Sequence, residues 1–336
     1  MSKRYCSGKA TDRMPVATAL TISDRLHDVL PDTEIAALTP LIEDIEALKR
    51  RRNAVVLAHN YMTPDIYHGV SDLTGDSLAL ARLAAETEAN VIVMAGVHFM
   101  AETAKIVSPH KTVLIPDLRA GCSLADSITP QDVALLRERY PDAAVVTYVN
   151  TSAAVKAACD ITCTSGNALD VVESLEADQV IFLPDQYLGR WVAGQTDKEI
   201  ILWQGSCEVH ERFTGAELRQ VRRDYPGVQI IAHPECPTDV LEEADFVGST
   251  AGMINWVKTE TPDRVVMVTE CSLSDNVAVE SPNTEFVRPC NLCPYMKMIT
   301  LEGIRDSLRE MKHEVLVPED IAKGARLAVE RMLAVT

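Results

Sequence analysis

The 336-residue chain lacks any hydrophobic run that approaches the roughly 20 residues of a membrane-spanning helix. Its first residues, Met1 to Arg4, lead into polar sequence rather than into the apolar segment of a secretion signal. Basic residues are also few, since 32 Lys and Arg stand against 49 Asp and Glu, which gives a net charge of -17. Such a chain repels polyanions. We therefore expect a cytoplasmic protein that binds neither a membrane nor a nucleic acid.

Several motifs of common site classes are missing as well. No G-x-G-x-x-G follows any expected strand, which disfavours a nicotinamide-dependent dehydrogenase. The pair Cys290 and Cys293 has no second Cys-x-x-Cys nearby, so a zinc ribbon is weakly supported. Residues 1–20 show no apolar periodicity and are expected to form a loosely ordered arm that includes Cys6.

Cysteine, in contrast, is present nine times, and an odd count without a secretion signal argues against a disulfide framework. Some of these thiols are therefore candidates for metal binding. Four of them recur in no pattern and are interpreted as small buried hydrophobic residues: Cys159, Cys163, Cys236 and Cys271.

The main positive feature is a repeat of about 85 residues. Each copy opens with an amphipathic helix, and the stretches 44–49, 132–137 and 217–222 align without a gap. A β-branched apolar run then follows, as is typical of strands buried on both faces of a parallel sheet. These first strands are expected at 54–57, 144–147 and 228–232, with further strands at 91–94, 180–183 and 265–268, and again at 112–115, 199–203 and 284–287.

Polar residues recur at matching places in the three copies. The first strands end in the triplets His59-Asn60-Tyr61, Tyr148-Val149-Asn150 and His233-Pro234-Glu235. Each copy continues with an Asp and, five residues later, a hydroxyl residue at which a helix is expected to start: Ser77, Ser165 and Thr250. A cysteine follows each last strand, namely Cys122, Cys207 and either Cys290 or Cys293.

This order of elements predicts three repeated three-layer α/β/α sandwich domains with parallel sheets, arranged around a pseudo-threefold axis. The expected organisation is an N-terminal arm and helix at 1–38, α/β repeats at 39–127, 128–212 and 213–298, and C-terminal helices at 299–336 that pack back on the first repeat.

If the strand ends of the three units point inward, one triplet, one hydroxyl and one cysteine per unit meet at one site. Thiolates select zinc or iron-sulfur clusters, and three ligands leave a metal position open as a Lewis acid. Hydroxyls at helix starts favour anions. Glu235 is the natural general base and Tyr61 a proton donor, while four residues are candidates to donate hydrogen bonds to carboxylates: His59, His233, Tyr148 and Asn150.

From about Leu41 to Leu327 the chain resembles the quinolinate synthase family. The motifs that carry this resemblance are His59-Asn60-Tyr61, Gly75-Asp76-Ser77, Met100 to Lys105, Ile115-Pro116-Asp117, Gly121-Cys122-Ser123, Tyr148-Val149-Asn150, Cys163-Thr164-Ser165, Pro184 to Gly189, Trp203 to His210, His233 to Cys236, Gly248-Ser249-Thr250 and Cys293 to Lys297.

The resemblance implies a condensation of iminosuccinate with dihydroxyacetone phosphate to quinolinate, with loss of phosphate and water, in NAD biosynthesis. It also implies an open 4Fe-4S cluster, with Cys122, Cys207 and Cys293 as ligands. Substrate would be held by His59, Ser77, Tyr148, Asn150, Ser165, His233, Glu235 and Thr250, and Tyr61, Glu235 and His210 would be catalytic. Implied partners are an aspartate oxidase or dehydrogenase that supplies iminosuccinate, and iron-sulfur assembly machinery.

Three alternatives stay open at this point. Some relatives carry three cysteines in the last loop, where this chain has Val287, Cys290 and Cys293, so Cys290 is a rival ligand. Cys293 is favoured because it directly precedes Pro294 to Lys297. An aconitase-like hydro-lyase would use the same open cluster on another hydroxyacid. A scaffold closed on structural zinc would want four protein ligands rather than three.

Overall fold

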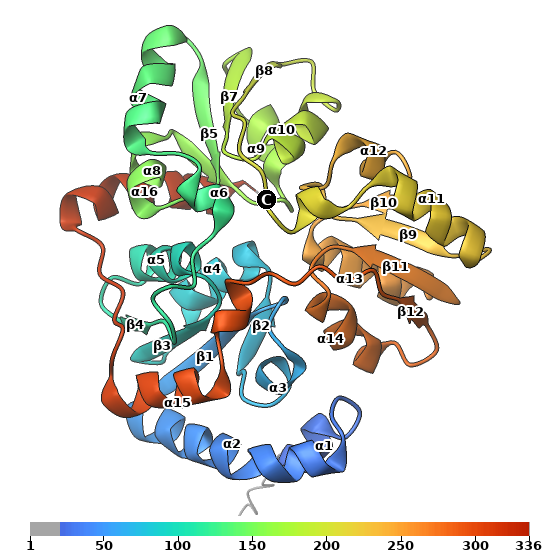
Figure 1. The fold of residues 1–336 in the computed structure, drawn as a ribbon. Helices are drawn as coiled ribbons and strands as arrows, with labels where there is room; N and C mark the ends of the chain where they lie inside the picture. Colours follow the sequence, from blue (N-terminus) through green and yellow to red (C-terminus); the bar gives the residue numbers. More distant parts are fainter. Residues whose placement is uncertain (1–20, 336) are drawn as a thin grey trace, which may run out of the picture.

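The fold, taken from a computed structural model, is described here for residues 21–335, so the expected N-terminal arm and Cys6 lie outside the described residues. Within that range the chain forms three four-stranded sheets, and every pairing between their strands is parallel. Helices cover both faces of the sheets, and the three α/β units surround the centre of the molecule (Figure 1). The structure thus confirms the predicted α/β class with parallel sheets.

The three sheets share one topology, because in each the first strand of the unit lies between the second and the third, and the fourth lies beyond the third. The first sheet contains β1 (Ala54–His59), β2 (Leu73–Gly75), β3 (Val91–Ala95) and β4 (Thr112–Leu114). The second contains β5 (Ala144–Tyr148), β6 (Ile161–Cys163), β7 (Gln179–Leu183) and β8 (Glu199–Leu202). The third contains β9 (Gln229–Ala232), β10 (Phe246–Val247), β11 (Arg264–Val268) and β12 (Glu285–Val287).

The helices connect and cover these strands. The first sheet is accompanied by α1 (Ile22–Leu26), α2 (Asp32–Arg52), α3 (Pro64–Tyr67), α4 (Ser77–Glu86), α5 (His98–Val107) and α6 (Ser123–Asp126). The second has α7 (Pro130–Arg139), α8 (Ala153–Ala158), α9 (Ala168–Glu173), α10 (Gln186–Ala193) and the 3-10 turn η1 (His210–Arg212). The third has α11 (Gly215–Asp224), α12 (Thr238–Leu241), α13 (Thr250–Glu260), α14 (Ser272–Glu280) and η2 (Met296–Met298), before α15 (Leu301–Glu310) and α16 (Glu319–Ala334).

One ion pair recurs in all three units and explains the repeated Asp. Asp72, Asp160 and Asp245 each accept a hydrogen bond from a backbone N–H of the first strand of their unit, at 2.7 to 2.8 Å. Each Asp also pairs with a cation at the end of the opening helix, in the pairs Lys49–Asp72 at 2.8 Å, Arg137–Asp160 at 2.9 Å and Arg222–Asp245 at 3.0 Å. These Asp residues therefore hold the opening helix and the first strand together.

Two details differ from the expectation. The hydroxyl residues start a helix only in the first and third units, where α4 begins at Ser77 and α13 at Thr250. In the second unit, α9 begins at Ala168, so Ser165 lies in the loop before it. The reason is local: the Asn167 side-chain oxygen accepts hydrogen bonds from the Thr164 N–H and hydroxyl and closes a turn across Ser165.

The ends of the described chain also depart from the predicted boundaries. The expected boundary at residue 38 falls inside α2, which is continuous from Asp32 to Arg52. The last two helices are present, and α15 packs on the first unit, against α2 and β3, whereas α16 lies mainly against α8 and β6 of the second unit and also contacts α5 of the first. Thr162 on β6 donates a hydrogen bond to the Ala328 carbonyl in this contact.

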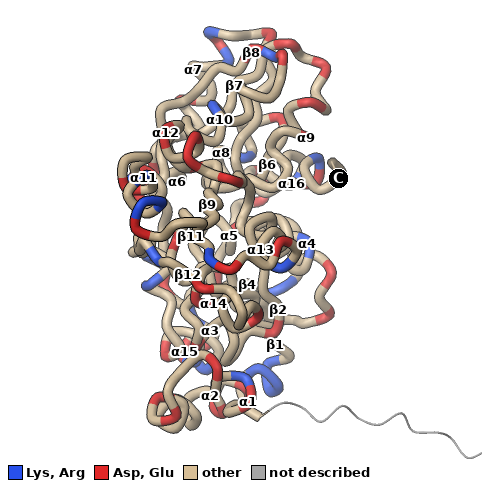
Figure 2. Tube along the Cα trace, turned by 90° about the vertical axis from the view of Figure 1, so that its right-hand side faces the viewer, with Lys and Arg blue, Asp and Glu red and all other residues tan. Residues whose placement is uncertain are grey.

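Within residues 21–335, no helix has the length and apolar character needed to cross a bilayer. Figure 2 shows the charged positions spread over the outside of the molecule.

Candidate active site

The carboxyl ends of the first strands meet at one cavity between the units. The empty space at this cavity is about 740 Å³, which includes space open to solvent. All thirteen residues singled out from the sequence line this cavity: His59, Tyr61, Ser77, Cys122, Tyr148, Asn150, Ser165, Cys207, His210, His233, Glu235, Thr250 and Cys293. The structure thus brings together side chains from three sheets that are far apart in the sequence.

Three thiols face this cavity, one from each unit. Free cysteines among residues 21–335 are Cys122, Cys159, Cys163, Cys207, Cys236 and Cys293, but only Cys122, Cys207 and Cys293 line the cavity. The segment that carries the second thiol, Cys207, packs closely on its neighbours at Gly205, two residues earlier. A Cβ on Gly205 would lie 2.5 Å from the Pro184 carbonyl oxygen and 2.6 Å from Ser127 Oγ.

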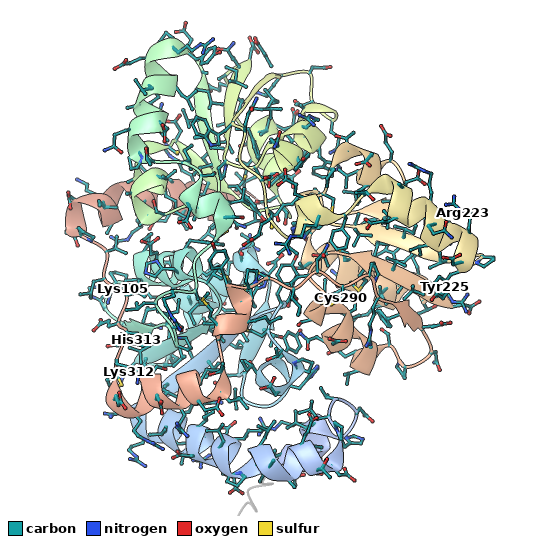
Figure 3. The ribbon with its side chains drawn as sticks, in the orientation of Figure 1. Lys105, Arg223, Tyr225, Cys290, Lys312 and His313 are labelled. Atoms are coloured by element: carbon teal, nitrogen blue, oxygen red, sulfur yellow. A yellow bond between two sulfur atoms is a disulfide. The ribbon has the colours of Figure 1, made fainter. Side chains whose placement is uncertain are left out.

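The remaining two described cysteines correct the interpretation of Cys271 as an unpaired, small buried residue. Cys271 and Cys290 are joined by a disulfide, with their Cα atoms 5.1 Å apart. Cys290 lies in the third unit (Figure 3). The sequence separation of 19 residues gave no sign of this contact. The pairing occupies the thiol of Cys290, the rival of Cys293, and leaves Cys293 as the free cysteine of its loop.

Burial raises the pKa of each cavity thiol. The pKa of Cys122 is raised to about 12, first by burial and further by the charges of Glu235 and Cys293. The pKa of Cys207 is raised well above its usual value by burial, Glu235 and Cys122, and burial also raises that of Cys293. Three thiolates in this space therefore require a nearby positive charge, such as a bound metal would provide.

Glu235 is buried and makes several contacts that favour its charged form. Its Oε2 lies 2.7 Å from His210 Nδ1 and 3.9 Å from His233 Nδ1. Burial alone would raise its pKa, but His210, His233 and a hydrogen bond from Tyr148 more than offset this, so the pKa lies below the usual range. Nearby Asp185 behaves in the opposite way, since burial and the charge of Glu235 raise its pKa strongly. Glu235 is thus ionised in the cavity, in contrast to Asp185 beside it.

The two histidines at the strand tips are neutral near pH 7. Burial lowers the pKa of His59 to about 4 and that of His233 to about 3. His233 Nε2 lies 3.1 Å from Ser165 Oγ, and its ring stacks on the ring of His210 with centroids 4.8 Å apart. These side chains therefore offer hydrogen bonds rather than positive charge.

Thr269, which sequence reasoning missed, connects two of the predicted catalytic residues. It follows β11 and is fully buried. Its Oγ1 lies 2.5 Å from the Tyr61 hydroxyl and 2.9 Å from His210 Nε2. Because His210 Nδ1 faces Glu235 Oε2, a continuous chain runs from Tyr61 through Thr269 and His210 to Glu235. No repeated pattern marked Thr269, since the residues at its place in the other units are Gly96 and Pro184.

Positive side chains are missing from the cavity. Among the described residues that line it there is no Lys and no Arg. Ser77 and Thr250 are instead the first residues of α4 and α13, where free backbone N–H groups and the helix dipole favour an anion. Asn150 Oδ1 is buried and has no partner among residues 21–335, so its amide is available to a ligand.

Hydrogen bonds between units hold the cavity walls in register. The Asn60 side-chain amide joins the first and third units, its oxygen accepting a hydrogen bond from Thr250 Oγ1 at 3.0 Å. Beside two of the thiols, Ser123 Oγ donates to the Ser206 carbonyl at 3.2 Å and accepts from the Glu208 N–H at 3.2 Å. The cavity is therefore a product of the packed units and not of one unit alone.

Comparison with known proteins agrees with this geometry. Residues 43–334 match the family model described as quinolinate synthetase A protein. Quinolinate synthase 2 of Mesorhizobium japonicum is 62% identical over 318 residues, which cover 95% of this chain and 98% of the relative. Quinolinate synthase of Agrobacterium fabrum is 61% identical over 318 residues, 95% of this chain and 92% of the relative. Quinolinate synthase of Xylella fastidiosa is 63% identical over 294 residues, 88% of this chain and 87% of the relative. The chain therefore belongs to the quinolinate synthase family.

Proposed function

We propose that the chain condenses iminosuccinate with dihydroxyacetone phosphate to form quinolinate, releasing phosphate and water. The observation that carries this proposal is the meeting of three thiols, one ionised carboxylate and the hydroxyl and imidazole groups of three units in one cavity. The family membership supports the same activity and does not favour the alternative of an aconitase-like hydro-lyase. An enzyme of this kind serves NAD biosynthesis.

Cys122, Cys207 and Cys293 would hold a 4Fe-4S cluster. The donor set fits, because three thiols and no fourth free cysteine line the cavity within the described residues, which leaves one metal position for substrate. When bound, the cluster supplies a Lewis acid that polarises a substrate oxygen and the positive charge that the buried thiolates need.

Cys207, His210 and Glu235 also place one ligand atom each within 4.8 Å of one another, a geometry that suits a single ion. The three-thiol set is favoured over this group because the hydrogen bonds of His210 already engage both of its ring nitrogens.

Tyr61 and Glu235 would be the acid and base. Once Glu235 has received a proton from substrate it donates to Nδ1 of His210, Nε2–H donates to the Thr269 oxygen, and the Thr269 hydroxyl donates to the Tyr61 oxygen, which leaves the Tyr61 O–H free to face substrate. A proton that Tyr61 gives to substrate can then be replaced along this chain, while Glu235 receives protons that leave substrate carbon or nitrogen. His210 would be catalytic as the central link of the chain.

Neutral donors would bind the anionic groups of the substrates. Ser77 and Thr250 suit a carboxylate or phosphate because they stand at the start of α4 and α13. Ser165 would act differently, through its contact with His233. The remaining contacts to carboxylates are assigned to His59, Tyr148, Asn150 and His233, while the ionised Glu235 would bind substrate by accepting a hydrogen bond from one of its N–H or O–H groups.

The finer organisation is part of the same proposal. We infer a pseudo-threefold arrangement of α/β repeats at 39–127, 128–212 and 213–298, which would bring one thiol from each repeat to a common point. Iron-sulfur assembly machinery would load the cluster, and an aspartate oxidase or dehydrogenase would supply iminosuccinate.

An anaerobic assay of the iron-loaded protein tests the proposed reaction. Quinolinate should form only when both substrates are present. Turnover of a hydroxyacid alone would instead support the hydro-lyase. A colourless protein that contains zinc and makes no quinolinate would support the alternative of a scaffold closed on structural zinc.

A further inference from the structure

A carboxyl residue lies beside the backbone segment that carries the cysteine in two of the three units, at equivalent positions in both. Asp185 and Glu270 are each the second residue after the third strand of their sheet, β7 and β11. Each forms an isolated parallel bridge, Asp185 with Gly205 and Glu270 with Asn291. Cys207 and Cys293 follow these bridge partners by two residues. In both units this bridge therefore fixes the backbone segment that carries the cysteine.

The first unit keeps the backbone contact but lacks the carboxyl. Its equivalent hydrogen bond runs from the His98 N–H to the Ala120 carbonyl at 2.7 Å, two residues before Cys122. The residue that matches Asp185 and Glu270 there is Val97. The carboxyl is thus an addition to the shared backbone scheme and not a requirement of the fold.

Glu270 differs from Asp185 in having a cation as partner. Its side chain is fully buried, and its Oε1 lies 2.9 Å from Lys297 Nζ and accepts from the Cys293 N–H at 3.4 Å. Its Oε2 accepts from the Ser272 N–H at 2.9 Å. Lys297 Nζ in turn donates to the Tyr61 carbonyl at 2.8 Å and to Ser272 Oγ at 2.7 Å. One ion pair therefore ties the Cys293 backbone of the third unit to the Tyr61 backbone of the first.

Stability alone does not account for such a pair. Replacing a buried ion pair by neutral side chains of similar size is often neutral for stability, because the cost of desolvating the charges offsets their attraction. A fixed relative position of the groups at its two ends is a better reason for keeping it.

We propose that Glu270 and Lys297 are positioning residues, which set the Cys293 thiol and the Tyr61 loop at a fixed distance from each other. This inference rests on the proposed roles of Cys293 as a metal ligand and of Tyr61 as an acid. Neither Glu270 nor Lys297 exchanges a proton with substrate in this scheme. Both act on the reaction through the residues that they hold.

The test compares Lys297→Met, Lys297→Arg and the double variant Glu270→Gln/Lys297→Met in the iron-loaded protein. Four quantities are measured: the rate at which a chelator removes iron under anaerobic conditions, kcat and KM for quinolinate formation, and the thermal midpoint of the metal-free protein. We expect Lys297→Met to release iron faster and to lower kcat, each by about 10- to 100-fold, as for residues that orient metal ligands. Lys297→Arg should recover part of both losses.

The double variant separates positioning from simple charge balance. It leaves no unpaired buried charge, so its thermal midpoint should return toward that of the wild type, while fast iron release and low kcat remain. Wild-type iron release and kcat in the double variant would overturn the inference. Arg264→Met serves as matched control, since Arg264 pairs with Glu285 at 2.6 Å on the outer edge of the same unit. Arg264→Met should change neither the rate of iron release nor kcat.

Cys293→Ala tells a failure of this inference from a failure of the proposed site. If Cys293→Ala loses its cluster while the Lys297 variants retain theirs with normal kcat, only the positioning role is wrong. If Cys293→Ala keeps a full cluster, the ligand assignment itself is wrong, and with it the inference.

Discussion

Replacement of Thr269 by Val tests the chain of hydrogen bonds between Tyr61 and Glu235. Valine has nearly the same shape as threonine but can form no hydrogen bond with Tyr61 or His210, whose polar atoms lie 2.5 and 2.9 Å from the hydroxyl. A buried polar group that loses its partner costs about 1 to 3 kcal/mol. If this cost falls on the transition state, kcat decreases by about 5- to 150-fold. KM should change little, because Thr269 does not line the cavity.

The assay is steady-state quinolinate formation by the anaerobic, iron-loaded protein, with iron and sulfide measured on the same sample. Thr269→Ser keeps the hydroxyl and should retain most of the activity. Thr162→Val is the matched control, since this buried threonine bonds the Ala328 carbonyl and does not line the cavity, and it should alter stability but not kcat. An unchanged kcat in Thr269→Val would show that no proton passes through this hydroxyl.

Three further predictions follow from the site. Glu235→Gln should lower kcat by about 10²- to 10⁴-fold while iron content stays at the wild-type level, and normal turnover would exclude Glu235 as base. Cys290→Ala should keep a full cluster and Cys293→Ala should lose it, as shown by anaerobic iron and sulfide analysis. His59 charges below pH 6.5 in the unfolded chain but only below about 4 when folded, so stability falls as the pH drops through this window. Between pH 7 and 5 the metal-free protein should lose about 2 kcal/mol in urea unfolding on this account, and the loss should shrink in His59→Asn.

The parts of the fold that repeat were the parts that could be predicted. Apolar β-branched runs recur because a strand buried on both faces must be hydrophobic, and nine strands were expected on this basis. The cations Lys49, Arg137 and Arg222 fall at one place in the aligned helices because each must reach the Asp of its own unit. Self-similarity thus carried information that a single copy would not have given.

The residues that could not be predicted act between units or at an edge. The strands β2, β6 and β10 are two or three residues long, too short for a pattern to show. The disulfide between Cys271 and Cys290 joins the start of α14 to the loop after β12, a pairing that depends on how β11 and β12 lie together. Thr269 matters only because Tyr61 from the first unit and His210 from the second both reach it. Sequence spacing within a unit has no bearing on such contacts.

The acidic composition of the chain and the anionic substrates proposed for it are compatible because charge acts locally. A net charge of -17 is set by side chains on the outside, most of them in water and screened by salt. The cavity has neither Lys nor Arg among its described lining residues, and burial holds His59 and His233 neutral. Anions there meet helix starts, hydroxyls and amides, whose hydrogen bonds gain strength where water is excluded. Neutral donors also leave the thiolates without a competing ammonium or guanidinium partner, so a metal cluster is the positive charge best placed to bind them.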